Sequence, residues 1–192
     1  MRHWSKVVIV SLLLLLAIFP LEAREEEEEK AILEGRAFVP FITSKGHVKE
    51  RFFSWATVTV IDLRTGKVMA EGETEIDGSY EIYVPPQRSY LIQFQKDAQT
   101  ILDVCRQVEK GKRYNLSFAD ARSTAMSLVL LHLFSSKKHP DIIIAYKANR
   151  ILREESFPLL QQKVLKAIAR GKNPEDDPEI QLLIDRIALS VQ

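Results

Sequence analysis

Apolar and polar residues alternate in short runs along the chain from residue 31 to residue 119. The clearest run, at residues 55–63, is rich in β-branched residues, as is typical of a half-buried strand. Thr65-Gly66 and Asp77-Gly78 favour tight hairpin turns between neighbouring runs. The other runs lie at residues 32–39, 67–74, 79–84, 90–95, 101–108 and 114–118. Seven short strands with turns between them predict an antiparallel β-sandwich or barrel.

After residue 119 the spacing of apolar residues changes to that of helices. Four helices are expected, at residues 125–134, 141–152, 157–170 and from residue 178 onward. Their expected start and stop signals are Ser123, Pro140, Ser156, Gly171 and the pair Asp177-Pro178. The predicted fold class is therefore α+β, with a β-sandwich at residues 31–119 and a helical region at residues 120–192.

The last predicted helix has one continuous apolar stripe. The stripe consists of Ile180, Leu183, Ile184, Ile187 and Val191. Such a face either packs within the chain or docks on a partner, and packing within the chain is the preferred interpretation because stripes of this kind are usually core.

The N-terminus has the three parts of a secretory signal. Arg2, His3 and Lys6 precede an uncharged run that ends at Pro20, and Ala23 provides a small residue before a cleavage point. A membrane anchor is the alternative, but the apolar run is shorter than the ~20 residues that a spanning helix needs. The sequence therefore predicts a signal peptide at residues 1–23, a charged tether at residues 24–30 and an exported protein, either periplasmic or secreted.

Composition restricts the partners and the source of stability. The chain has 27 Lys and Arg against 26 Asp and Glu, a balance that argues against binding to nucleic acid or to an anionic membrane. Cys105 is the single cysteine, so an internal disulfide cannot form and the core must be stabilised by apolar burial. Because it lies in a strand-like run, Cys105 is expected to be a buried thiol.

Several motifs in the first half of the chain occur in an order and at a spacing that resemble a known domain. They are Gly35, Ala56-Thr57-Val58, Thr65-Gly66, Thr74, Asp77-Gly78-Ser79-Tyr80, Val84-Pro85-Pro86 and Tyr90. In this pattern residues 32–118 resemble the carboxypeptidase regulatory-like domain, a transthyretin-like sandwich of exported bacterial proteins. The resemblance implies a seven-stranded antiparallel sandwich that serves as a non-catalytic accessory or adhesion module with no fixed ligand.

The chain departs from that family pattern at three places. Trp55 and Gln87 occupy positions where the family usually has glycine. A long insert at residues 40–54 separates the first two predicted strands, the first of which Pro40 is expected to end.

Candidate catalytic and metal-binding residues are sparse. His47, His132 and His139 have no second ligand at a metal-binding spacing, and His132 is expected to be a core residue. No phosphate-binding loop or nucleophile elbow is present. Nor is the C-terminal Tyr-Arg-Gly-Ser of the transthyretin-like ring-opening hydrolases. We therefore predict no enzyme activity, no catalytic residue, no cofactor and no metal site.

Glu71, Glu73 and Glu75 alternate along one predicted strand. Carboxylates on one face could bind a cation such as Ca²⁺. The preferred interpretation is that the row forms the solvated face of an antiparallel sheet.

Aromatic and basic residues gather at the end of the insert. Phe52, Phe53 and Trp55 lie beside Lys49 and Arg51, a combination that suits a sugar or peptide partner because aromatic rings give large contact area at low entropic cost. The alternative is that Trp55 and one of the phenylalanines pack into the edge of the sandwich. These five residues form the predicted binding site.

The sequence leaves two main functions open. The first is a non-catalytic binding or scaffold protein of the cell envelope that acts through protein–protein interaction, which an uncovered apolar stripe on the last helix would favour. The alternative is a carbohydrate-binding or adhesin-type accessory domain, which an exposed aromatic patch would favour. A deep pocket lined by converging polar groups would favour an enzyme instead.

Overall fold

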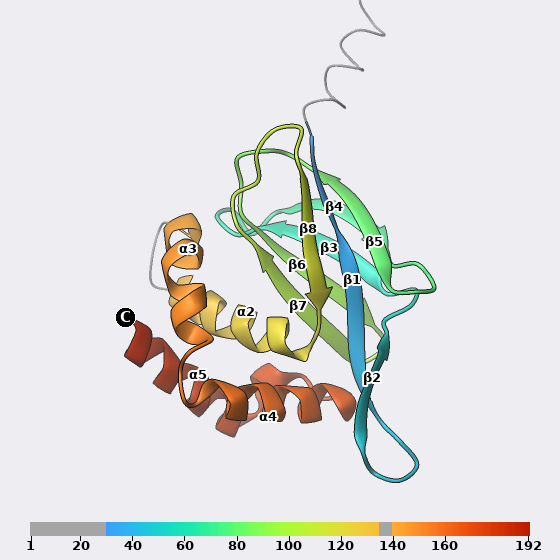
Figure 1. Ribbon diagram of the computed structural model, residues 1–192, viewed down its shortest axis with the longest axis vertical. Helices are drawn as coiled ribbons and strands as arrows, with labels where there is room; N and C mark the ends of the chain where they lie inside the picture. Colours follow the sequence, from blue (N-terminus) through green and yellow to red (C-terminus); the bar gives the residue numbers. More distant parts are fainter. Residues whose placement is uncertain (1–29, 135–139) are drawn as a thin grey trace, which may run out of the picture.

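The computed structural model describes residues 30–134 and 140–192, which form two packed β-sheets with a group of helices at one end (Figure 1). The first sheet contains β1 (Ala31–Ile42) with β2 (Val48–Phe52) and β5 (Ser79–Val84) on one side and β8 (Arg113–Ala119) on the other. The second has the order β4 (Val68–Glu73), β3 (Thr57–Asp62), β6 (Tyr90–Lys96), β7 (Gln99–Cys105). The predicted signal peptide and nearly all of the tether lie outside the described residues, as does His139.

The core lies between the two sheets and follows from the alternation in the sequence. Val58 and Val60 of β3 and Ile92 and Phe94 of β6 face inward and are fully buried, opposite Leu33 of β1. Each such side chain contributes roughly 1.5–3 kcal/mol through burial. Cys105 is buried and free, as predicted.

The insert between the first two predicted strands adds an eighth strand, so the predicted count of seven was wrong. β1 does not end at Pro40 but continues to Ile42 and turns into β2. β2 forms its backbone hydrogen bonds with the odd-numbered residues of β1; the carbonyl of Ala37, for example, accepts from Phe53 N–H. The nitrogen of Pro40, an even-numbered residue, therefore points away from β2. Since proline cannot donate a backbone hydrogen bond, it fits where its nitrogen faces no strand.

The pairing of β1 with β8 is parallel, whereas the sequence predicts a wholly antiparallel sandwich. The register between the two strands shifts between Glu34 and Arg36, so Gly35 lies opposite a bulge in β8. Ser117 has a positive φ of 60° in this bulge, and its N–H donates to Oδ1 of Asn115 at 2.8 Å. Bulges of this kind re-aim the side chains that follow them.

The helical region contains α2 (Ala121–Phe134), α3 (Pro140–Ile151), α4 (Phe157–Ala169), the short 3₁₀ turn η1 (Pro174–Asp176) and α5 (Pro178–Val191). All five residues of the predicted apolar stripe on α5 are buried within the chain, which confirms the preferred interpretation. Among the residues described, no helix combines the length and the apolar character needed to cross a membrane.

Two helix starts and one histidine differ from expectation. Asp120 rather than Ser123 caps α2, since its Oδ1 accepts from the N–H groups of Arg122 and Ser123. Ser156 makes no side-chain cap to α4, whereas Asp177 caps α5 as predicted by accepting from Glu179 N–H. His132 is exposed rather than buried in the core, with Nε2 3.5 Å from Oδ1 of Asp185.

Helix α2 covers an edge strand of the second sheet. The hydroxyl of Thr124 accepts from Leu102 N–H at 3.0 Å, and the hydroxyl of Ser123 donates to the Leu102 carbonyl at 2.7 Å. Within the described residues, β7 pairs with β6 on its other side and with no strand on the side of α2, so these hydroxyls satisfy backbone groups that an edge strand leaves open.

Thr124→Val is expected to lower the free energy of unfolding by about 1–3 kcal/mol, because the Leu102 N–H would lose its partner in a half-buried place. Urea denaturation measures the change. Ser190→Ala, which removes a hydroxyl that donates to the carbonyl of Ile187 in its own helix, should cost less than about 0.5 kcal/mol. Equal effects in the two variants would show that α2 does not protect this edge.

Trp55 and Gln87 lie at the two positions where the resembled domain usually has glycine, and the backbone is left-handed at both. Trp55 has φ 57° and Gln87 has φ 61°. For a residue with a Cβ, this conformation costs roughly 1–2 kcal/mol. The backbone at both positions has the conformation that glycine favours, and membership of the family stays a prediction.

Candidate functional site

Three phenylalanines meet on the outer face of the first sheet. Phe38 of β1 contacts Phe52 of β2 and Phe118 of β8, with ring centroids 5.3 Å apart in each pair. The Phe52 residue is 44% exposed to solvent, and Phe118 is 60% exposed. We name Phe38, Phe52 and Phe118 the outer aromatic cluster.

Strand register explains the position of the cluster. Phe38 is paired directly with Phe52 across β1 and β2, and Arg36, two residues earlier on the same face, is paired with Phe118 across β1 and β8. The guanidinium of Arg36 lies 6.0 Å from the Phe52 ring centroid and forms an ion pair with Asp77 at 3.1 Å. A cation over an exposed ring stabilises the arrangement by only about 0.5–1 kcal/mol.

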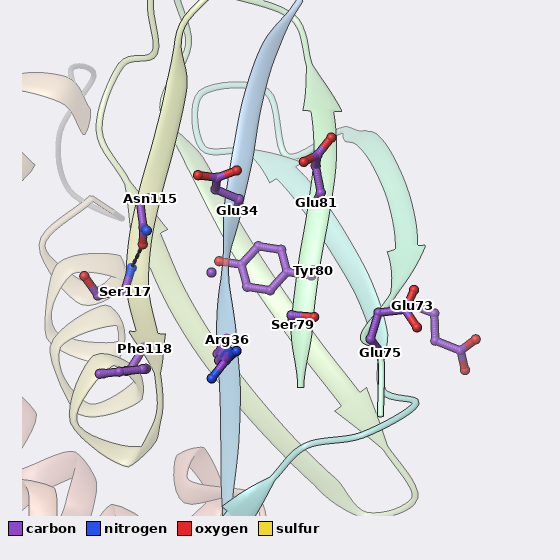
Figure 2. Close-up of a pocket in the computed structure, with 11 residues that line it drawn as sticks. Glu34, Arg36, Glu73, Glu75, Ser79, Tyr80, Glu81, Asn115, Ser117 and Phe118 are labelled. Carbon is purple, nitrogen blue, oxygen red and sulfur yellow. Dashed lines mark hydrogen bonds between the residues drawn. The ribbon is translucent and has the colours of Figure 1, made fainter. Parts of the chain in front are cut away.

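A shallow depression of about 680 Å³ lies beside the cluster, where the outer face of the first sheet meets the edge strand β4 of the second (Figure 2). It shares Arg36 and Phe118 with the cluster. We name it the sheet-face depression, and its other lining residues are Glu34, Gly35, Glu73, Glu75, Ser79, Tyr80, Glu81, Asn115 and Ser117.

Acidic residues dominate the charge of this depression. Arg113 donates to Glu34 at 2.5 Å and to Glu81 at 2.8 Å, and its hydrogen bond holds the pKa of Glu81 below the usual range. No ion pair joins Glu73 or Glu75 to a basic side chain within residues 30–134 and 140–192. Two carboxylates therefore remain without a compensating charge at one side of the depression.

Tyr80 lines the depression but hides its hydroxyl. Its side chain is only 5% exposed, and the hydroxyl has no hydrogen-bond partner in the part of the chain that is described. A Cβ added at Gly35 would lie 3.0 Å from Oη of Tyr80 and 3.2 Å from the carbonyl oxygen of Ser117. Figure 2 shows the ring reaching from β5 toward β1, with the hydroxyl between Glu34 and Arg36. Burial strongly raises the pKa of this hydroxyl, so it stays protonated.

The five residues of the predicted binding site do not come together. Phe53 is buried in the core at 3% exposure, so it cannot offer a contact surface. Lys49 and Arg51 lie on the face of β2 opposite to Phe52, and Arg51 stacks 5.4 Å from the ring of Phe41 instead. Trp55 is half exposed in the turn before β3.

Of the predicted site residues, Phe52 alone lies in the outer aromatic cluster. Sequence reasoning missed Arg36, Phe38 and Phe118. The alternation of residues 32–39 places Arg36 and Phe38 opposite the buried Ala37 and Val39, so the sequence carries a signal for these two. It carries none for Phe118, which depends on the bulge in β8.

The row of Glu71, Glu73 and Glu75 is exposed on β4 and the turn that follows it. Within the described part of the chain, no group of three or more His, Cys, Asp or Glu side chains gathers as a metal ion would require. Glu73 and Glu75 line the sheet-face depression, and Glu71 does not.

Comparison with known proteins gives weak similarities. No family model matches the chain, and no curated protein matches it. The major plantain pollen allergen Pla l 1 is 18% identical at a TM-score of 0.35, over 47% of this chain and 91% of the allergen. A candidate carbohydrate-binding protein from Pseudomonas aeruginosa is 10% identical at a TM-score of 0.33, over 49% of this chain and 90% of its own length.

A 9R-lipoxygenase from Cyanothece is 11% identical at a TM-score of 0.30, and the match covers 99% of this chain but only 36% of the lipoxygenase. The three similarities all have TM-scores below 0.5, so they assign neither a family nor a function to this chain.

Proposed function

We propose that this chain is a non-catalytic, exported carbohydrate-binding module whose recognition surface is the outer aromatic cluster together with the sheet-face depression. The observation that carries the proposal is the exposure of Phe52 and Phe118, which Phe38 holds together on one sheet face. Large exposed apolar groups gathered at one place are unusual on a soluble surface and favour a binding role.

The chemistry of this face suits a sugar. A pyranose ring has an apolar C–H face that stacks on an aromatic ring, and its hydroxyls need donors and acceptors around that contact. Phe118 supplies an exposed ring, and Arg36, Asn115 and Glu34 supply polar groups beside it. The depression of about 680 Å³ is open and falls within the range of about 300–1,000 Å³ that small-ligand sites occupy.

A scaffold role through the helices has less support. An uncovered apolar stripe on the last helix would favour that function, and the stripe residues of α5 are buried against the rest of the chain. The exported location rests on the predicted signal peptide at residues 1–23, and the absence of catalysis rests on the sequence motifs.

Phe118→Ala is expected to weaken glycan binding at least tenfold, since stacking on an exposed ring contributes about 1.4 kcal/mol or more. Purified protein expressed from the full chain is first screened on a glycan array, and the strongest ligand is then titrated by calorimetry. Stability should change little because Phe118 is 60% exposed.

Leu189→Ala is the matched control, because Leu189 is an exposed apolar residue on α5 at 70% exposure. Its affinity should equal that of the wild type. The proposed function would be rejected if the protein bound no glycan on the array, or if Phe118→Ala bound the ligand as tightly as the wild type. Capture of an envelope protein in place of a glycan would favour the scaffold function instead.

A further inference from the structure

We infer that Trp55 forms a second stacking subsite of the proposed carbohydrate-binding surface, and that the ligand is a linear glycan long enough to reach from Phe118 to Trp55. This inference rests on the proposed function and names the substrate class of the same surface.

The first observation is the backbone of Trp55, which is left-handed although the residue is bulky. Its φ is 57°, in a region that glycine enters freely and that is strained for a residue with a Cβ. Strained residues persist only where the surrounding structure holds them, and they cluster at functional sites. The side chain of Trp55 is therefore a candidate for a functional role.

The second observation is the set of hydrogen bonds that holds this turn. The buried hydroxyl of Thr74 donates to the Phe53 carbonyl at 2.5 Å and accepts from the Ala56 N–H at 2.9 Å. The carbonyl of Thr74 accepts from the Trp55 N–H at 3.1 Å. Because the backbone on both sides of Trp55 is already fixed, a ligand that stacks on the ring would have little of the chain to order on binding.

The third observation is that Trp55 stays exposed despite this anchoring. The residue keeps half of its surface open to solvent, and Ile76, in the turn between β4 and β5, is mostly exposed as well. The hydroxyl of Ser54 donates to the Ile76 carbonyl, so the two turns lie side by side. Large apolar groups gathered on a surface favour a binding role.

Continuity with the outer aromatic cluster identifies the occupant. Trp55 follows Phe52 by three residues, so their Cα atoms are at most about 11 Å apart. Phe52 is itself joined through Phe38 to Phe118. In a β-1,4-linked glucan each pyranose ring carries an apolar C–H face, so one linear chain can stack on successive aromatic rings. A single sugar cannot cover both Phe118 and Trp55, whereas a chain of several units can.

The experiment varies the length of the glycan. Purified protein expressed from the full chain is titrated by calorimetry with β-1,4-linked glucose oligomers of two and of six units. The six-unit oligomer is expected to bind at least tenfold more tightly than the two-unit oligomer. Trp55→Ala and Trp55→Gly should both lose this gain, because neither retains the ring, and should keep their affinity for the two-unit oligomer at the outer aromatic cluster.

The two substitutions separate the ring from the fold. Glycine relieves the left-handed strain and alanine does not, so Trp55→Gly should have the higher urea midpoint of the two. Equal loss of the gain in two variants of unequal stability assigns the loss to the missing ring. Gln87→Gly is the matched control, because it makes the same kind of backbone change at φ 61° in the loop between β5 and β6, and it should keep the full gain.

The fluorescence of Trp55 gives a direct readout of contact. Trp4 is the other tryptophan of the chain and lies in the predicted signal peptide, so Trp4→Phe leaves Trp55 as the single emitter. The six-unit oligomer should shift the emission to shorter wavelength and protect it from quenching by acrylamide, and the two-unit oligomer should do neither. A tryptophan with a merely structural role would show no such change.

Equal affinity for the two oligomers would overturn the inference and leave the proposed function intact, as would a gain that persists in Trp55→Ala. If Gln87→Gly loses the gain as fully as the Trp55 variants do, the loss is not specific to the ring and the inference also fails. If neither oligomer binds while the array retains another glycan, the substrate class is wrong. Binding of no glycan at all would reject the proposed function itself.

Discussion

Wild-type protein is expected to be more stable at pH 5 than at pH 8 by about 3 kcal/mol, and Asp103→Asn should remove most of that difference. Asp103 is buried in β7, where burial first, and then repulsion from Asp120, raise its pKa to about 7 against a backbone hydrogen bond from Val104 that lowers it. The unfolded chain releases this proton near pH 4, so the free energy of unfolding falls as pH rises from 4 to about 7 and then levels off.

Urea denaturation at several pH values from 5 to 8 measures this slope. Asp97→Asn, at an exposed turn between β6 and β7, is the matched control and should keep the wild-type slope. Glu50, whose pKa is raised by burial and by Asp120, should leave a smaller slope of the same sign in Asp103→Asn. Parallel profiles for the wild type and Asp103→Asn would contradict the assignment of the slope to Asp103.

Gly78→Ala should destabilise the protein by about 3 kcal/mol or more. Gly78 has φ 73°, and an added Cβ would lie 2.5 Å from the carbonyl oxygen of Ala37, which is backbone and cannot turn away. The cost therefore combines left-handed strain of roughly 1–2 kcal/mol with displacement of β1. Ala37 also donates to the Gly78 carbonyl and accepts from Phe53, so the displacement affects β1, β2 and β5 together.

The matched control is Gly66→Ala. Gly66 has φ 68°, but an added Cβ there would meet no atom within 4 Å. Strain alone should cost about 1–2 kcal/mol in this variant. Urea midpoints compare the two, and equal losses would mean that the close approach of Gly78 to Ala37 carries no energetic cost.

Local signals in the sequence predicted the parts of the fold that depend on neighbouring residues. Residues 79–84 form β5 with the predicted bounds, because an Asp-Gly turn precedes a strictly alternating run. Asp177 and Pro178 start α5 as expected, since capping and the fixed φ of proline act within one helical turn. Ser123 was misassigned as a cap because Asp120, three residues earlier, can satisfy the same N–H groups.

Features that depend on distant pairing could not be predicted. Nothing near Pro40 shows which side of β1 lacks a partner strand, so its tolerance inside the strand appears only once β2 pairs with β1. The outer aromatic cluster has the same origin, because Phe118 reaches Phe38 through a parallel pairing and a bulge that join residues about eighty positions apart. The alternation in residues 32–39 predicts that Arg36 faces outward. It does not predict that Arg36 belongs to a site, because that depends on its pairing with Phe118.

The contact of α2 with β7 also bears on whether the sandwich can exist alone. A chain cut after Ala119 would lose Ser123 and Thr124 and leave the backbone of Leu102 open at a sheet edge. Open edges recruit strands from other copies, which leads to self-association. We therefore expect a chain that is cut near residue 120, where strands change to helices, to self-associate instead of behaving as an independent unit.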